Sequence, residues 1–331
     1  MKLRNAFAGI CGSDLHMYFA PETARFDVRK PHPLTGATLP QILGHEFSGT
    51  VVEVGDDVRE ISVDDRVTVW PVYYCGTCAA CRVGRHNACQ TIGFHGLSAS
   101  GGGMAEFTTV PASKVHKLPA NVDLRLGALV EPMAVAWRAV SRSRVGSAQT
   151  ALIAGAGPIG IGVWFALRAR GVERVLVSEP SHARRDVIAA LGATVVDPLN
   201  DDLASAVAEL TDGDGVHVAF DAAGAGPALA SAIHNLVPGG RVVVVAIHER
   251  PMELLPTLLA RTETEILGSF AYLPQDFDEV IQAMADGAYD TTGWVKEVEL
   301  DSVGDAVREL RAGRAAKVLV RSDARTLNSP G

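Results

Sequence analysis

The sequence has no long hydrophobic run and no excess of positive charge. No segment supplies the roughly 18 uncharged apolar residues that a membrane-spanning helix needs, which excludes such a helix. Residues 1–10 lack the apolar stretch of a secretory signal peptide, so the expected compartment is the reducing cytoplasm. The formal net charge is −8 with acids and bases interspersed, which gives no reason to expect nucleic acid or an anionic membrane surface as a partner.

Internal repeats and low-complexity linkers are absent as well. The chain has 331 residues, of which 47% are hydrophobic, and this is enough for two hydrophobic cores. A two-domain enzyme that acts on a small molecule fits these bounds.

Cysteine is scarce and unevenly distributed. Four of the five cysteines lie close together, at Cys75, Cys78, Cys81 and Cys89, whereas Cys11 stands alone. Two intervening residues let neighbouring thiolates turn back onto one ion, so the group predicts a tetrahedral zinc site with four sulfur ligands. Such a site is coordinatively closed and therefore structural, which leaves Cys11 for the chemistry of a second, catalytic zinc.

Two other interpretations of the cysteine group are weaker. In iron–sulfur ferredoxins the fourth cysteine usually follows after three residues and precedes a proline, whereas here seven residues intervene and Gln90 follows Cys89. Disulfides are not expected in a reducing compartment. Zinc remains the favoured ion.

The pattern of apolar residues changes along the chain. Up to about residue 120 it is typical of an irregular β domain, with strands predicted over 48–54, 65–70 and 105–110. From about residue 130, apolar strands alternate with amphipathic helices, which predicts βαβ units and a parallel sheet. These strands are predicted over 148–154, 173–178, 216–220 and 240–246, with helices over 158–170 and 182–191. The last predicted elements are helices over 276–285 and 303–310, strands over 295–300 and 317–320, and a loose tail from Thr326.

A glycine-rich turn joins the first of these parallel strands to its helix. Gly155 would make the tight turn, Gly157 would let the backbone approach a pyrophosphate, and Gly160 would let helix and strand pack closely. Pro158 and Ile159 complete this predicted cofactor site. Glu179 follows the next strand, where a carboxylate hydrogen-bonds the adenosine ribose and repels the 2′-phosphate of NADP.

NAD is therefore the expected cofactor. Arg184 and Arg185 oppose this prediction because they could approach a phosphate, but a solvated helix face is the favoured interpretation of both.

Cys11 needs further ligands, and two segments offer them. His45 and Glu46 lie in the run LGHEFSG, and Glu131 lies in LVEPMAV. One thiolate, one imidazole and one carboxylate leave a tetrahedral zinc one open position. A second bound carboxylate would make the zinc anionic and weaken its ability to acidify an alcohol. We therefore expect either Glu46 or Glu131 as the direct ligand, with the other contacting the metal-bound water or exchanging with substrate.

Each residue also has an ordinary structural interpretation. His45 could be a buried structural histidine, Glu131 could favour a helix N-terminus, and Asp14 could be a turn residue. Their combination with the cysteine group and the nucleotide motif favours the metal site.

Together these motifs resemble the zinc-dependent medium-chain alcohol and polyol dehydrogenases. The resemblance covers nearly the whole chain through CGSDLH at 11–16, GHE at 44–46, the four cysteines, Glu131 with Pro132, and GAGPIG at 155–160. Within that family the chain is most similar to the 2,3-butanediol dehydrogenases, with which it shares PHPLTG at 31–36, GFHGLS at 93–98 and VSEPS at 177–181.

The resemblance implies a fold and a set of roles. It implies a GroES-like β domain over 1–132 and 271–331, an inserted doubly wound Rossmann domain over 133–270, and a dimer or tetramer. It also implies that Cys11 and His45 bind zinc, that Asp14 orients His45, and that Ser13 and His16 relay the proton.

The expected activity is NAD-dependent oxidation of a vicinal diol or reduction of a hydroxyketone, such as 2,3-butanediol and acetoin. Sorbitol-like polyol oxidation or L-threonine oxidation is the alternative within the family. A catalytically inactive nucleotide-binding protein is the alternative from another class.

The chain departs from the family pattern at its start. Members normally carry two to three dozen more residues before the CGSD motif, whereas only ten precede Cys11. A domain that lacked its opening strands would expose an unpaired sheet edge. We therefore expect the natural gene product to be longer; an intact-mass measurement on native protein that matched 331 residues would refute this.

Overall fold

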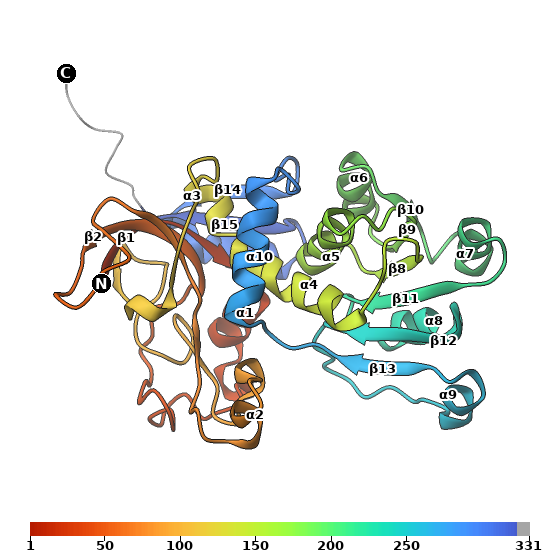
Figure 1. Cartoon of the computed structure of the whole chain (residues 1–331), viewed down its shortest axis with the longest axis horizontal. Helices are drawn as coiled ribbons and strands as arrows, with labels where there is room; N and C mark the ends of the chain where they lie inside the picture. The colour runs from red at the N-terminus through yellow and green to blue at the C-terminus, as the bar shows by residue number, and fades with distance from the viewer. Residues whose placement is uncertain (323–331) are drawn as a thin grey trace. The chain divides into compact units, whose positions relative to one another are not determined.

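A computed structural model describes residues 1–322, so the tail predicted from Thr326 lies outside the described residues. The chain forms two compact units (Figure 1). The first comprises Met1–Glu131, Leu273–Asp286 and the chain from Thr291, and the second comprises Pro132–Tyr272 and Gly287–Asp290.

The first unit is built on a mainly antiparallel sheet. Within the described residues its order is β14-β15-β1-β2-β3-β7, with β6 also paired to β1. Its strands are β1 (Lys2–Ile10), β2 (Glu46–Glu53), β3 (Arg66–Val69), β6 (Phe107–Thr109), β7 (Val115–Lys117), β14 (Val295–Glu299) and β15 (Lys317–Arg321). Because β1 pairs with β15 on one side and with β2 on the other, it is not an exposed edge.

Buried apolar side chains from adjacent strands stabilise this sheet. Leu3 and Ala8 of β1 point into a core that also contains Phe47, Val51 and Val67, all fully buried. A second group, formed by Ile10, β15 and helix α11, packs on the same sheet. The helices of this unit are α1 (Gly12–Phe19), α2 (Ala79–Arg82), α3 (Leu124–Gly127), α10 (Pro274–Ala285) and α11 (Val303–Arg311). The short strands β4 (Val72–Tyr73) and β5 (Gly93–Phe94) form a separate pair.

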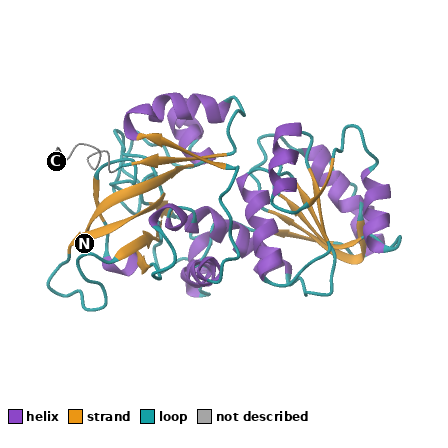
Figure 2. Cartoon of the chain, turned by 90° about the horizontal axis from the view of Figure 1, so that it is seen from above, coloured by secondary structure: helices purple, strands orange, loops and turns teal. Residues whose placement is uncertain are grey.

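The second unit is a parallel sheet with helices on both faces (Figure 2). Across the described residues its order is β10-β9-β8-β11-β12-β13, and this doubly wound order confirms the predicted fold class. Its strands are β8 (Ala151–Ala154), β9 (Val175–Ser178), β10 (Thr194–Val196), β11 (Val216–Asp221), β12 (Leu236–Val244) and β13 (Glu265–Gly268). Its helices are α5 (Pro158–Ala169), α6 (His182–Ala190), α7 (Leu203–Thr211), α8 (Gly226–His234) and α9 (Pro256–Thr262), and α4 (Val130–Ser143) leads into it.

Burial on both faces explains the continuous apolar strands of this sheet. All four residues of β8 and all four of β9 are buried, as expected for parallel strands between two helical layers. Strand β8 and strand β11 lie side by side although two βα units separate them in sequence. The chain therefore reverses direction across the sheet at this pair, where doubly wound folds bind their ligands.

Several elements of the second unit were not predicted. Strands β10 and β13 are short and form the two edges of the sheet, so most of their residues are exposed or only partly buried and show no clear apolar run. Helices α7 and α8 are rich in alanine, which weakens the contrast between their apolar and polar faces.

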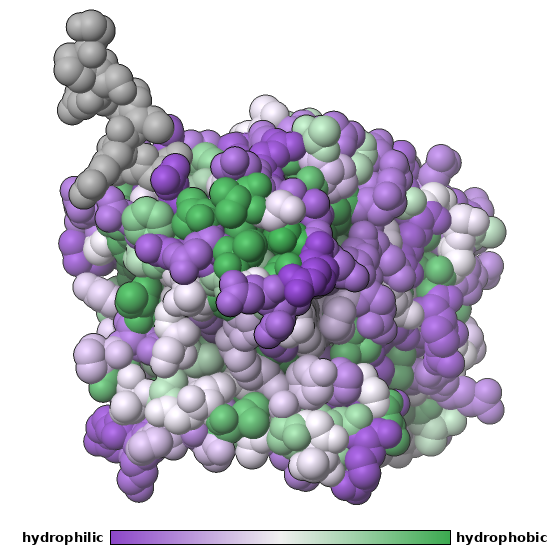
Figure 3. Space-filling model, turned by 60° about the vertical axis from the view of Figure 1, so that its left-hand side comes forward, coloured by the Kyte–Doolittle hydropathy of each residue, from purple (hydrophilic) through white to green (hydrophobic). Residues whose placement is uncertain are grey.

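The surface agrees with the interspersed charges of the sequence. Figure 3 shows one face of the molecule, where hydrophilic residues surround small hydrophobic areas. Among residues 1–322, none of the helices combines the length and the apolar character needed to cross a bilayer.

His95 connects the segment GFHGLS to the sheet. The burial of its side chain leads us to expect that the stability of the protein depends on pH. Its imidazole is buried and lies 3.0 Å from the Thr108 hydroxyl, and burial lowers its pKa to about 4. An unfolded histidine titrates near 6.5, so the unfolded chain binds an extra proton between these pH values. The free energy of unfolding should therefore fall as the pH drops from about 6.5 to 4, by on the order of 3 kcal/mol.

Urea unfolding at several pH values checks this expectation. Other groups titrate in the same range, so the difference between wild type and His95→Gln isolates the contribution of His95. The variant should show a flatter acid limb, and an unchanged slope would contradict the assignment.

Candidate metal centre and dinucleotide site

Three predicted metal ligands converge in the first unit. Cys11 follows β1 and begins α1, while His45 and Glu46 stand at the start of β2, which pairs with β1. One ligand atom from each of these three residues lies within 4.8 Å of the others. Adjacent strands therefore bring together groups that are separated by more than thirty positions in the sequence.

A buried lysine also contacts this group. Lys317, at the start of β15, forms an ion pair with Glu46 and donates to the Ile10 carbonyl at 3.1 Å. Both charged side chains are almost fully buried. Burial alone lowers the pKa of an ammonium group, but Glu46 and Cys11 raise the pKa of Lys317 above its ordinary value. Gly9 lies opposite Glu46, and a Cβ there would collide with the Glu46 carboxylate.

Lys317 is the main site residue that sequence reasoning missed. The run KVLV predicted a strand, and its lysine received no role. A signal was present, because lysine is almost never buried in a sheet unless a carboxylate neutralises it.

His45 lies between Asp14 and Ser13. Its Nδ1 is 3.5 Å from an Asp14 carboxylate oxygen, and its Nε2 is 3.3 Å from the Ser13 hydroxyl. The other Asp14 oxygen accepts from the Cys11 backbone N–H at 2.8 Å. Burial would lower the pKa of His45, but Asp14, Cys11 and Glu131 raise it well above its usual range.

Glu131 and His16, which were also predicted to belong to this centre, lie outside the group of three ligands. Glu131 is buried in the first turn of α4, near enough to raise the pKa of both His45 and Lys317, but it is not one of the three grouped ligands. His16 is exposed on α1, one turn beyond Ser13.

The environment of this centre suits a divalent cation. Cys11, His45 and Glu46 provide sulfur, nitrogen and oxygen donors, a set that zinc binds. The negative groups that raise the pKa of His45 also attract a metal ion. In addition, an Asp14 oxygen and His45 Nδ1 are buried without a hydrogen bond that satisfies them, so a bound metal would fix the imidazole while Asp14 orients it.

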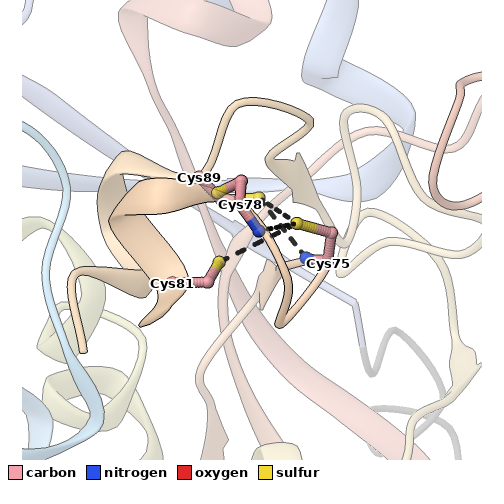
Figure 4. A group of neighbouring side chains, drawn as sticks. All are labelled: Cys75, Cys78, Cys81 and Cys89. Carbon is pink, nitrogen blue, oxygen red and sulfur yellow. Dashed lines mark hydrogen bonds between the residues drawn. The ribbon is translucent and has the colours of Figure 1, made fainter. Parts of the chain in front are cut away.

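The four-cysteine group forms the second centre (Figure 4). The sulfur atoms of Cys75, Cys78, Cys81 and Cys89 all lie within 4.8 Å of one another. Backbone N–H groups of Thr77 and Cys78 lower the pKa of Cys75 to about 5, which favours the thiolate that zinc requires. The chain therefore has a site with the closed donor set of structural zinc.

The glycine turn of the second unit fits a dinucleotide. Gly155 has a φ of 101°, and an added Cβ would lie 3.0 Å from the Ala223 nitrogen. A Cβ at Gly160 would collide with the Gly155 carbonyl, whereas one at Gly157 would meet nothing within 4 Å. The turn is thus tightly packed on its inner side and open at Gly157, where Pro158 begins α5. The free N–H groups of this helix end suit a pyrophosphate.

Glu179 is buried at the carboxyl end of β9. Its oxygens accept from the N–H groups of Ala156 at 2.7 Å and Ser181 at 2.8 Å. Each oxygen keeps capacity for a second hydrogen bond. Arg185 pairs with Asp197 at 2.8 Å, and Arg184 lies 4.0 Å from Glu179.

Two family models match the chain. The model of the alcohol dehydrogenase GroES-like domain matches residues 1–120, and that of the zinc-binding dehydrogenase matches residues 158–286. The first match confirms the predicted GroES-like domain. Fold and site together define a zinc-binding oxidoreductase with a dinucleotide domain.

Named relatives of the chain support its assignment to this class of oxidoreductases. The chain is 37% identical to (R,R)-butanediol dehydrogenase of Bacillus subtilis, over 97% of this chain and 92% of that protein. It is 36% identical to 2-dehydro-3-deoxy-L-galactonate 5-dehydrogenase of Pseudoalteromonas atlantica, over 98% and 92%. The crystal structure of the Bacillus subtilis 2R,3R-butanediol dehydrogenase superposes with a TM-score of 0.89 over 97% of this chain and 91% of that one, at 37% identity. The chain belongs to the zinc-containing medium-chain alcohol dehydrogenase family.

Solved relatives hold a nicotinamide dinucleotide, NADH in one structure and NADP in another. An Escherichia coli alcohol dehydrogenase was solved with NADH; it is 27% identical, with a TM-score of 0.84 over 97% of this chain and 91% of that one. A zinc-binding dehydrogenase of Sinorhizobium meliloti was solved with NADP; it is 29% identical, with a TM-score of 0.86 over the same shares.

Proposed function

We propose that this protein is an NAD-dependent dehydrogenase that interconverts a vicinal diol and its hydroxyketone, with 2,3-butanediol and acetoin as the substrate pair. The observation that carries the proposal is the group of Cys11, His45 and Glu46, because three protein ligands leave a tetrahedral zinc one position for the substrate oxygen. A complete open donor set favours an active enzyme over an inactive nucleotide-binding protein.

The substrate assignment rests on similarity within the family. The chain resembles the butanediol dehydrogenases in the segments PHPLTG, GFHGLS and VSEPS, and the relatives at 36–37% identity include one of these enzymes. Other relatives are named for D-xylulose and L-idonate. A sugar polyol or sugar acid is therefore the second candidate, and L-threonine is the third.

The side chains of the first unit have separable roles in this reaction. A bound zinc would supply Lewis-acid polarisation of the substrate oxygen, and a bound nicotinamide dinucleotide would supply the hydride acceptor. Cys11, His45 and Glu46 would hold the metal, and Asp14 orients the His45 imidazole. Ser13 accepts the hydroxyl proton and His16, exposed on the same helix, delivers it to solvent.

Glu131 takes the remaining role near the metal. It is buried close to His45 yet lies outside the ligand group. We assign Glu46 as the direct ligand and Glu131 as the group that contacts the water or substrate at the open position.

Glu179 should set the preference for NAD. Its buried carboxylate would repel a 2′-phosphate, and such a like-charge contact costs several kcal/mol. Arg185 is held by Asp197 and by two backbone carbonyls, which supports its assignment to the helix face rather than to a phosphate. Glu179→Gln keeps one of the two acceptor oxygens and removes the charge, so the ratio of kcat/KM for NAD to that for NADP should fall at least about tenfold.

Initial rates with the two cofactors check this prediction. Glu173→Gln, an exposed substitution just before β9, serves as the matched control. A ratio unchanged by Glu179→Gln would show that another group selects the cofactor.

A substrate panel tests the proposed activity. NADH absorbance is followed with each 2,3-butanediol stereoisomer, sorbitol, L-idonate and L-threonine, and acetoin is used in the reverse direction. We expect the highest kcat/KM with one butanediol stereoisomer. A higher value for sorbitol, L-idonate or L-threonine would replace the substrate assignment, and no turnover of any of them would contradict it.

A homo-oligomer, dimeric or tetrameric, remains a prediction. Strand β13 forms an edge of the parallel sheet among the described residues and carries the exposed Ile266, which is compatible with pairing to a second copy. Light scattering after size exclusion gives the stoichiometry.

A further inference from the structure

A carboxylate–imidazole pair joins two loops at the carboxyl edge of the parallel sheet. Asp221 is the last residue of β11 and is fully buried. One of its oxygens accepts from His248 Nε2 at 2.5 Å, and the other accepts from the N–H groups of Ala223 and Gly224 at 3.2 and 3.1 Å. His248 comes from the loop after β12 and retains 18% of its side-chain exposure.

The loop that contains His248 also packs directly on the loop after β11. The N–H groups of Val245 and Ala246 both donate to the Asp221 carbonyl at 3.0 Å. A Cβ at Gly224 would lie 2.6 Å from the Ile247 carbonyl. The backbones of the two loops are thus in contact, and the Asp221–His248 pair is the side-chain link between them.

This pair lies next to the glycine turn. The Ala222 N–H donates to the Ala154 carbonyl at 2.9 Å, and a Cβ at Gly155 would lie within about 3 Å of the backbone of Ala222 and Ala223. A continuous series of contacts therefore connects the glycine turn, through residues 222–224, to Ile247 and His248.

Strand order tells which half of the cofactor these loops face. A doubly wound sheet binds a dinucleotide across its switch point, with one nucleotide half on each side. Glu179 lies after β9, on the adenosine side of β8, whereas Asp221 and His248 follow β11 and β12 on the other side. Ile247, which is 73% exposed, stands at that edge beside the pair.

We propose that His248 is a positioning residue for the nicotinamide half of the cofactor. Its hydrogen bond to the buried Asp221 carboxylate holds the loop from Val245 to His248 against β11 and keeps Ile247 in place. Backbone hydrogen bonds hold Val245 and Ala246, and Met252 packs against the core further along the loop, so loss of the imidazole would loosen the residues between them, including Ile247. The inference rests on the dinucleotide site and is independent of the substrate.

The binding of two ligands can distinguish a role at the nicotinamide half from a general contribution to the stability of the domain. NADH contains both nucleotide halves, whereas ADP-ribose lacks the nicotinamide. Dissociation constants for both are measured by calorimetry on the zinc-loaded protein without substrate, which makes the result independent of turnover. The variants are His248→Ala, His248→Gln, whose amide retains a donor for Asp221, and the control His234→Ala, an exposed histidine at the end of α8.

For His248→Ala we expect NADH to bind about tenfold more weakly, a change in the range of one hydrogen bond to a charged group. ADP-ribose should bind within twofold of wild type, His248→Gln should recover most of the NADH affinity, and His234→Ala should match wild type. Equal weakening of both ligands, or no change in either, would overturn the proposal. Failure of the wild type to bind NADH would overturn it together with the dinucleotide assignment, whereas NADH binding without diol turnover would affect only the proposed substrate.

Discussion

Replacement of Cys11 by serine should lower kcat/KM for the diol by at least about 1,000-fold. Zinc contributes several kcal/mol of charge stabilisation to a reacting oxygen, and each tenfold change in rate corresponds to about 1.4 kcal/mol. Cys11 provides the sulfur atom among the three grouped ligands, and a serine hydroxyl is a much weaker zinc ligand than a cysteine sulfur. Initial rates of NADH formation measure the loss.

The same substitution in the other zinc site is the matched control. Cys75→Ser should lower the melting temperature because the four-sulfur site is structural, while the protein that remains folded should keep kcat/KM within a few-fold of wild type. Full activity of Cys11→Ser would contradict the catalytic assignment. If instead Cys75→Ser lost activity to the same extent without any loss of stability, the two centres would have been assigned the wrong roles.

Replacement of Lys317 by methionine should lower the free energy of unfolding by about 3–5 kcal/mol, because it leaves one charge of a buried ion pair without its partner. The Glu46 carboxylate and the Lys317 ammonium are each 3% exposed or less, so water cannot solvate the remaining carboxylate. Methionine keeps the length and apolar character of the lysine chain, which limits the change to the loss of the charge. Urea unfolding of wild type and variant gives the difference.

A second variant and a second buffer show whether the lost stability comes from the ion pair. Lys317→Arg retains the positive charge and should lose much less stability than Lys317→Met. A metal ion held by Glu46 would partly neutralise the carboxylate, so the loss should be larger after chelator treatment than in zinc-containing buffer. A loss below about 1 kcal/mol in both buffers would show that the ion pair contributes no more than a surface pair.

The fold could be predicted where burial leaves a clear pattern in the sequence. Strands β8 and β9 are buried on both faces and therefore consist of short, nearly continuous apolar runs. Strand β11 is similar, with His217 and the final Asp221 as its polar residues. The edge strands β10 and β13 lack such runs, because a partly solvated strand tolerates polar residues. No strand was predicted over Lys2–Ile10, yet this segment forms β1 and pairs on both sides, since strands from distant parts of the sequence complete the sheet around it.

The site residues likewise divide into those that could be predicted from the sequence and those that could not. The four cysteines could be found because metal ligation requires particular residue types at short spacings. Cys11 lies more than thirty positions from His45 and Glu46, so these three were found from their residue types and from the family resemblance. Lys317 and the Asp221–His248 pair depend on contacts between elements that are distant in sequence. Such contacts leave no regular spacing in the sequence. A buried charged side chain is nevertheless rare, and each of these charged residues therefore needs a partner.

Zinc content per chain, measured by mass spectrometry of wild type and Cys11→Ser after dialysis, tests the assignment of two metal centres most directly. We expect two zinc ions in the wild type and one in the variant, with the remaining ion held by Cys75, Cys78, Cys81 and Cys89. One ion in the wild type, or two in the variant, would contradict a catalytic zinc at Cys11.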